Sequence, residues 1–246
     1  MRRTLMVCAI SMAAAAAGCN APPLEGSGNV VTETRDIEGV NAVSLSLQGE
    51  LHVRQADEES LMVTADDNLL PYIATVVSEG RLEIRESETC AGRDFRPTAP
   101  IRYELAVRDL GGIAVRGSGA VRADTLACVE MGIALSGSGD VAIESLEADE
   151  IDVAISGSGD VTVGGSARVQ SVAVSGSGSY EAGALRTETA AVAVSGSGDV
   201  TVWAEASLDI GVSGSGEVSY YGDPKVEQRV SGSGTVRPMG RRSEEI

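Results

Sequence analysis

The chain has 246 residues and a formal net charge of −17, from 19 basic and 36 acidic residues. This excess of acids disfavours binding to nucleic acid or to an anionic membrane surface, because neutralising phosphates requires clustered lysine and arginine. With only one phenylalanine, one tryptophan and five tyrosines, the core of one large β domain or two small ones has to be mainly aliphatic.

Residues 1–18 are expected to be a lipoprotein signal peptide. Arg2 and Arg3 form a charged start, residues 5–17 form a short apolar run, and small residues precede Cys19. This ending resembles the bacterial lipobox, which predicts lipid attachment at Cys19. The alternative is an ordinary secretory signal that is cleaved near the same point.

The chain is therefore expected to be exported and held at a membrane by its lipid. Asn20 follows the cysteine where an aspartate would resemble an inner-membrane retention signal, which favours the outer membrane. The periplasmic face and the cell surface both stay open. Residues 19–29 are rich in proline, glycine and serine, and this composition predicts a flexible tether.

Residues 30–112 have strand patterns without a regular repeat. Apolar residues alternate over 43–47 and over 101–107, and residues 76–84 are expected to form a hairpin around Glu79 and Gly80. Because an uncovered coil edge invites pairing with another chain, we expect this irregular β region to cap the repeats that follow.

Residues 113–236 contain the tripeptide Gly-Ser-Gly seven times, at intervals of 20, 20, 19, 20, 18 and 18 residues. Apolar residues alternate on both sides of each copy, which is the spacing of a β-strand. A near-constant period of this length is typical of a solenoid. The fold prediction is therefore all-β, a single-stranded parallel β-helix, right-handed by expectation, with glycine corners. The copies begin at Gly117, Gly137, Gly157, Gly176, Gly196, Gly214 and Gly232.

Residues 237–246 are expected to be a C-terminal tail. Pro238 lacks the N–H that a further strand would need, and the neighbouring arginines resist edge pairing.

Catalytic chemistry finds little support in the sequence. The many serines would need a base, and His52 is the only histidine. No Gly-x-Ser-x-Gly elbow is present, and no lysine follows the glycines as it would in a phosphate-binding loop. We therefore expect structural serine ladders, no enzymatic activity and no cofactor.

Four acidic residues follow the second glycine of their coils, namely Asp140, Asp160, Asp199 and Glu217. As a column they are weak candidates for a calcium site, since such a site needs six or more converging oxygens. A solvated acidic stripe that keeps the domain soluble is the favoured interpretation.

Two cysteines remain if Cys8 leaves with the signal and Cys19 carries lipid. An oxidising compartment would favour a disulfide between Cys90 and Cys128. Two free thiols are the equal alternative, because sequence spacing does not reveal their distance.

The order of these features resembles a bacterial family called putative auto-transporter adhesin, head GIN domain. The resemblance covers about residues 30–236. It is carried by the turn at 67–70, the hairpin at 75–84, the repeated Ser-Gly-Ser-Gly-Asp coils and the closing segment 221–224. It implies an exported β-helical domain, often a lipoprotein, without established activity or known functional residues.

The leading hypothesis is a non-enzymatic envelope lipoprotein that presents an extended polar, acidic face for binding or adhesion. Its ligand would be a glycan, an envelope polymer or a protein, and its oligomeric state stays open. The first alternative is a scaffold that assembles end to end. A β-helical enzyme that degrades polysaccharides is the least favoured hypothesis, because the turns are short and the solenoid has few basic side chains.

Overall fold

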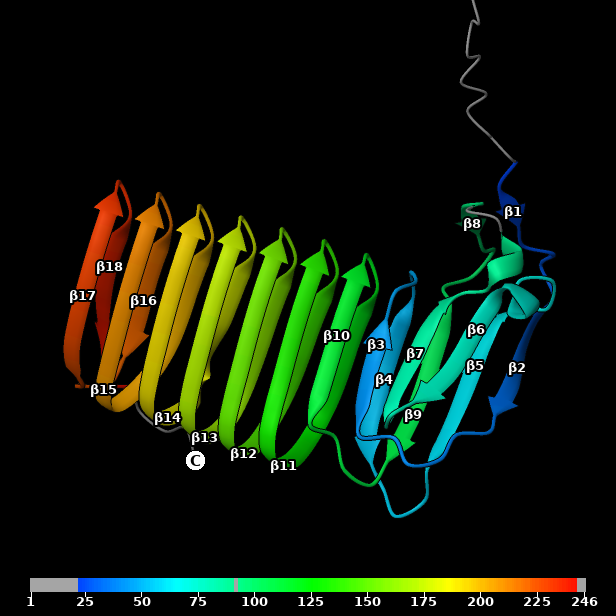
Figure 1. Ribbon diagram of the computed structural model, residues 1–246, viewed down its shortest axis with the longest axis horizontal. Coiled ribbons are helices and arrows are strands. Elements are labelled where there is room, and N and C mark those ends of the chain that lie inside the picture. Colours follow the sequence, from blue (N-terminus) through cyan, green and yellow to red (C-terminus); the bar gives the residue numbers. More distant parts are fainter. Residues whose placement is uncertain (1–21, 91–92, 243–246) are drawn as a thin grey trace, which may run out of the picture.

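The protein is a β-solenoid joined to an irregular β cap, as a computed structural model that describes residues 22–90 and 93–242 shows (Figure 1). The expected all-β parallel solenoid is confirmed. Within the described residues, no helix is long and apolar enough to cross a membrane. The predicted signal peptide and the lipidation site at Cys19 lie outside the described residues.

Each regular coil is a single long strand that bends around an aliphatic interior. Every strand pairs in parallel with the next coil, from Gly112 opposite Gly132 to Gly196 opposite Gly214, and the register shifts after Ile143, Thr162 and Glu181. The stack begins with the short strand β10 (Gly112–Gly117). The complete coils are β11 (Ala120–Gly137), β12 (Asp140–Gly157), β13 (Asp160–Gly176), β14 (Ser179–Gly196) and β15 (Asp199–Gly214).

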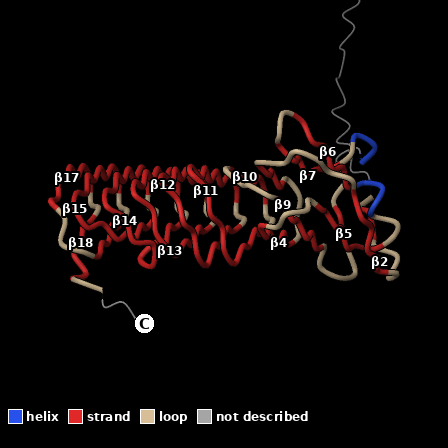
Figure 2. The backbone as a smooth tube through the Cα atoms, turned by 90° about the horizontal axis from the view of Figure 1, so that it is seen from below, coloured by secondary structure: helices blue, strands red, loops and turns tan. Residues whose placement is uncertain are grey.

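The coils have two broad faces that meet at the Gly-Ser-Gly corners. We call face 1 the strand segments that lead into each corner, and face 2 the segments that leave it. The tube view shows these coils stacked along one axis (Figure 2). Alternate residues point inward, so Val153, Ile155 and Val161 are buried while Ala154 and Asp160 are exposed.

Glycine is required at the corners because successive coils touch there. Gly157 has φ of +145°, and a Cβ on it would overlap the carbonyl oxygen of Gly137. Ser158 N–H donates to the same Gly137 oxygen at 2.9 Å. The serines that precede the corners are aligned in register, as predicted, and backbone hydrogen bonds join successive corners.

The cap continues both faces of the solenoid. Face 1 runs from β10 into β3 (Ala42–Leu45), β7 (Arg81–Glu86) and β6 (Ile73–Ser78). Face 2 runs from β11 into β4 (Glu50–Gln55), β9 (Arg102–Val107), β5 (Ser60–Asp66) and β2 (Val30–Arg35). The last pairs on each face are antiparallel, β6 with β7 and β2 with β5. The N-terminal end of the stack therefore finishes in antiparallel pairs, with β2 and β6 as its outermost strands.

The segment before β2 is attached to the cap, which contradicts the prediction of a flexible tether up to residue 29. Strand β1 (Leu24–Glu25) pairs with β8 (Phe95–Arg96), and Leu24 is buried. Gly28 N–H donates to Asp66, and the side chains of Ser27 and Asn29 donate to Asp67. Two short 3-10 helices lie nearby, η1 (Leu70–Tyr72) and η2 (Glu88–Cys90).

The C-terminal end finishes with three strands, β16 (Glu217–Tyr221), β17 (Lys225–Gly232) and β18 (Thr235–Gly240). The predicted tail from residue 237 is wrong for its first residues, because β18 includes Pro238 and pairs with β16 through Gly240. Arg242 then turns back along the solenoid, where its Nη1 donates to the carbonyl oxygen of Gly183.

Candidate binding surface

Face 1 carries an open groove of about 1040 Å³ on its outer side. Two columns of outward residues form its floor, and most of them are alanine or glycine. One column is Gly112, Gly132, Asp152, Ser171, Ala191 and Asp209, and the other is Ala114, Ala134, Ala154, Ala173, Ala193 and Gly211.

The in-register stacking creates this floor. Ala134 pairs with Ala154, and Ala154 with Ala173, so small side chains repeat every coil, at a spacing of about 4.8 Å. Short side chains leave the backbone close to the surface, and the result is a flat, largely apolar floor that crosses several coils. A ligand with a repeating or extended shape fits such a surface better than a compact one.

The groove also has polar lining residues. Asn41 and Arg81 line it at the cap end, Glu130 adds a carboxylate, and Asp152 and Asp209 add two more from the first floor column. Its described lining contains no aromatic residue, so the stacking contacts that aromatic side chains commonly provide are not used here. The groove therefore offers a ligand van der Waals contact with the small floor residues and hydrogen bonding to these polar side chains.

The acidic column lies on face 2 and is interrupted. The ladder places Asp160 opposite Ser179, Ser179 opposite Asp199, and Asp199 opposite Glu217. Asp160 N–H approaches Asp140 Oδ1 at 3.4 Å, and Ser179 N–H approaches Asp160 Oδ1 at 3.2 Å. These carboxylates therefore accept N–H groups of the next coil, which gives them a structural role.

The metal candidates do not come together as a cluster. Among the residues that the structure describes, no group of three or more histidine, cysteine, aspartate or glutamate residues is arranged to hold a metal ion. Glu217 instead pairs with Arg237 at 2.8 Å.

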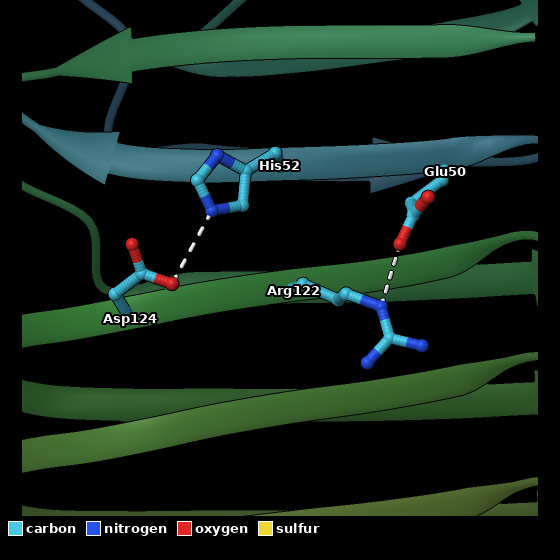
Figure 3. Close-up of polar contacts among 4 residues, drawn as sticks. All are labelled: Glu50, His52, Arg122 and Asp124. Carbon is cyan, nitrogen blue, oxygen red and sulfur yellow. Dashed lines mark hydrogen bonds and ion pairs between the residues drawn. The ribbon is translucent and has the colours of Figure 1, made fainter.

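The single histidine joins the cap to the solenoid on face 2. His52 Nε2 lies 3.4 Å from Asp124 Oδ1, beside a 2.6 Å ion pair between Arg122 Nε and Glu50 Oε1 (Figure 3). All four side chains lie on β4 and β11, whose residues His52 and Arg122 are opposite each other in the ladder. They are substantially exposed, so the pairs orient the cap with little gain in stability.

The expected disulfide is not formed: Cys90 and Cys128 are free cysteines in the structure. The Cys90 thiol donates to the carbonyl oxygen of Arg93 at 3.3 Å and is buried in the cap. Cys128 lies on the first complete coil, opposite Ala148. The structure therefore agrees with the alternative prediction of two free thiols.

Of the four aromatic residues in the solenoid, two are buried and two, Tyr220 and Tyr221, are partly exposed. Tyr180 and Trp203 are buried, and Trp203 Nε1 donates to Glu205 at 2.8 Å. The groove of face 1 was not predicted from the sequence, although alanine or glycine at alternate positions between the inward valines was the signal for it.

Comparisons with known proteins point to one family. The model of the family described as putative auto-transporter adhesin, head GIN domain, matches residues 40–224. A comparison with curated proteins gives no match.

Solved structures share the fold over most of the chain. A putative adhesin from Bacteroides fragilis is 25% identical with a TM-score of 0.83, and the match covers 88% of this chain and 100% of that one. A structure named a putative lipid binding protein, from Parabacteroides distasonis, is 25% identical with a TM-score of 0.74, over 88% and 99% of the chains. A putative adhesin from Parabacteroides merdae, 20% identical with a TM-score of 0.71 over 89% and 100%, shows the fold alone.

Proposed function

The chain belongs to the family described as putative auto-transporter adhesin, head GIN domain, and we propose that it is a non-enzymatic envelope lipoprotein that binds an extended ligand along face 1. The ligand is a glycan, an envelope polymer or an extended segment of a protein. Relatives named for adhesion or for lipid binding support a binding role.

The observation that carries this proposal is the groove of about 1040 Å³ along face 1. The second column of its floor is alanine or glycine in every coil, so each unit of an extended ligand meets a similar apolar environment there. Many weak contacts that act together give avidity without a deep pocket. The rigid stacking of the coils reduces the entropy that binding would otherwise cost.

The net charge of −17 fits this role. An acidic surface keeps the domain soluble and away from phosphate-rich membranes. In this proposal the lipid on Cys19 provides the attachment to the outer membrane, and the solenoid provides the contact with the ligand.

The scaffold alternative is less favoured by the architecture. A filament of indefinite length needs two complementary ends. The N-terminal end finishes in the antiparallel pairs β2–β5 and β6–β7, whereas the coils of the solenoid stack in parallel. The enzyme alternative is less favoured by the groove, whose floor residues are mostly alanine and glycine.

A binding screen tests the proposal. The chain from Asn20 onward is applied to arrays of neutral and acidic glycans, to peptidoglycan and to envelope protein extracts. For any ligand found, Ala154→Arg and Ala173→Arg place long side chains on the exposed groove floor. We expect each to weaken binding roughly 10-fold, because the floor is then blocked at its centre.

The matched controls are Ala142→Arg and Thr162→Arg, which lie in register on face 2 of the same coils. They add the same charge at the same height along the solenoid and should leave binding unchanged. Equal losses in both pairs would indicate a general effect of charge, and unchanged binding in the face 1 variants would exclude the groove as the site.

A further inference from the structure

The two ends of the solenoid differ in how they finish. At the C-terminal end, β17 pairs with β15 and β18 pairs with β16, and within the described residues no strand pairs with their outer edges (Figure 1). Val230 is 44% exposed, whereas its register partner Val212 is 2% exposed. This end therefore presents strand edges and apolar side chains that the rest of the solenoid covers.

The hydrogen-bonding direction of β17 follows from the coils before it. Gly132 N–H donates to Gly111 O, and the ladder aligns Gly132 with Glu227 through the intervening coils. In the last coil, Ser233 N–H donates back to Gly214 O. Successive residues of a strand point their N–H and C=O groups to opposite sides. Val226, Gln228 and Val230 therefore direct these groups out of the end.

The sequence of β17 is complementary to itself when a second copy is placed antiparallel about Gln228. Gln228 then faces Gln228 of the second copy, and Val226 faces Val230. Glu227 faces Arg229, an opposite-charge pair that the symmetry produces twice. The three residues with outward backbone groups fall in the hydrogen-bonded positions of this ladder, and the valines continue the interior column.

We propose that two copies of this chain form a closed dimer through antiparallel pairing of β17 with β17, centred on Gln228. The pairing extends face 1 across the interface as one sheet. Because the symmetry axis is perpendicular to face 1, both faces point in the same direction.

The charges at this end permit the approach of two copies of an acidic chain. Arg229 pairs with Asp209 at 3.4 Å, Arg237 with Glu217 at 2.8 Å, and Arg241 with Asp223 at 3.2 Å. These arginines offset the carboxylates of the coil beneath them. These pairs therefore reduce, at this end, the repulsion that a net charge of −17 would cause.

The neighbouring edge strand, β18, contributes less to the proposed pairing of the two copies. Pro238 lies in β18 and removes one backbone donor from that strand. The back-folded Arg242 side chain contacts Gly183, away from the β17 edge. The pairing strand is thus β17. Because the two-fold pairing uses the same edge of both copies, it limits the assembly to two copies.

Sedimentation velocity of the chain from Asn20 onward, which retains every described residue, measures this association. We expect a monomer–dimer equilibrium with a Kd of roughly 10–100 μM, because the end of one coil is a small interface. The proposal is wrong if the chain remains a monomer at about 1 mM, or if association continues beyond the dimer, as in a filament.

Charge exchange identifies the register. Glu227→Arg and Arg229→Glu each turn both attractive pairs into repulsive ones, and each should weaken the dimer at least about 10-fold. The double variant restores opposite charges across the interface and should return the Kd to within about threefold of the original. A dimer that neither single variant weakens, or that the double variant fails to restore, would refute this register.

A matched pair of apolar substitutions locates the interface at one end. Val230→Asp should weaken the dimer strongly, because its partner in the proposed ladder is Val226. Val76→Asp changes a valine of similar exposure, 42% against 44%, in the edge strand β6 at the other end and should have no effect. Circular dichroism spectra that match the unsubstituted chain establish that both variants are folded.

Discussion

Gln170 Nε2 donates a 2.7 Å hydrogen bond to the hydroxyl of Tyr180 in the interior of the solenoid. Both residues are fully buried. Tyr180 occupies a column that is otherwise valine, between Val161 and Val200, and burial raises the pKa of its hydroxyl. Gln170 Oε1 has no partner among the described residues, so this pair is a polar defect in an aliphatic core.

Removing one member of this pair should cost more than removing both. Tyr180→Phe leaves the Gln170 amide without its acceptor, and we expect the free energy of unfolding to fall by about 1–3 kcal/mol. Gln170→Met combined with Tyr180→Phe removes both polar groups and should recover most of that loss. Urea unfolding followed by circular dichroism measures both. A double variant less stable than Tyr180→Phe would contradict this account.

The corner glycines should resist substitution far more than the serine between them. Gly157→Ala places a Cβ against the Gly137 carbonyl and holds alanine at φ of +145°, so we expect a loss of about 2 kcal/mol or more. Ser158→Ala changes an exposed side chain at the same corner and should cost less than about 0.5 kcal/mol. Thermal unfolding of the two variants gives the comparison, and similar losses would contradict the requirement for glycine.

Acid should loosen the attachment of the N-terminal segment to the cap. The Thr98 hydroxyl, at 2.6 Å, and the N–H groups of Thr98 and Gly28 hold the pKa of Asp66 below its ordinary value of 3.8. A lowered pKa stabilises the fold above the unfolded value, and this contribution disappears as the pH falls through the folded value.

The control for this pH dependence is Asp66→Asn, which has no carboxylate to titrate. The stability difference between the original chain and this variant should be constant from pH 7 to about pH 5 and should shrink below about pH 4. Urea midpoints across this range measure it. A stability difference that grows on acidification would show that folding raises the pKa of Asp66 and does not lower it.

The two cysteines should react at different rates. Burial raises the pKa of both thiols, but Cys90 is 1% exposed in the cap while Cys128 is only partly buried on the solenoid. A short maleimide pulse on the folded chain from Asn20 onward should modify Cys128 first. Mass spectrometry of the peptides identifies the modified site, and two unreactive thiols even after unfolding would show that a disulfide had formed.

The solenoid and its register follow closely from the sequence. Alternating apolar residues around each Gly-Ser-Gly predict the strands, and a period near 20 residues predicts which residues stack. The hairpin at residues 76–84 is also confirmed, as β6 and β7. These predictions succeed because each depends on a local pattern or on contact with the adjacent repeat.

The groove and the proposed dimer edge depend on the same register, but no local pattern in the sequence specifies them. Ala154 and Ala173 are unremarkable in the sequence, and they form a floor only when coils align them with Ala134 and Ala193. Likewise Gln228 becomes the centre of a self-complementary edge only because β17 is the last strand of its face.

The sequence by itself determined the repeating unit, its aliphatic interior and its glycine corners, because strand alternation and corner geometry are properties of neighbouring residues. Only the tertiary structure decided that Leu24 docks beside Phe95 and that Asp66 joins Gly28 to Thr98. It also decided that Cys90 and Cys128 stay apart as free thiols. These contacts lie outside the repeat, so no period in the chain specifies them, and they arise from the packing of the cap as a whole.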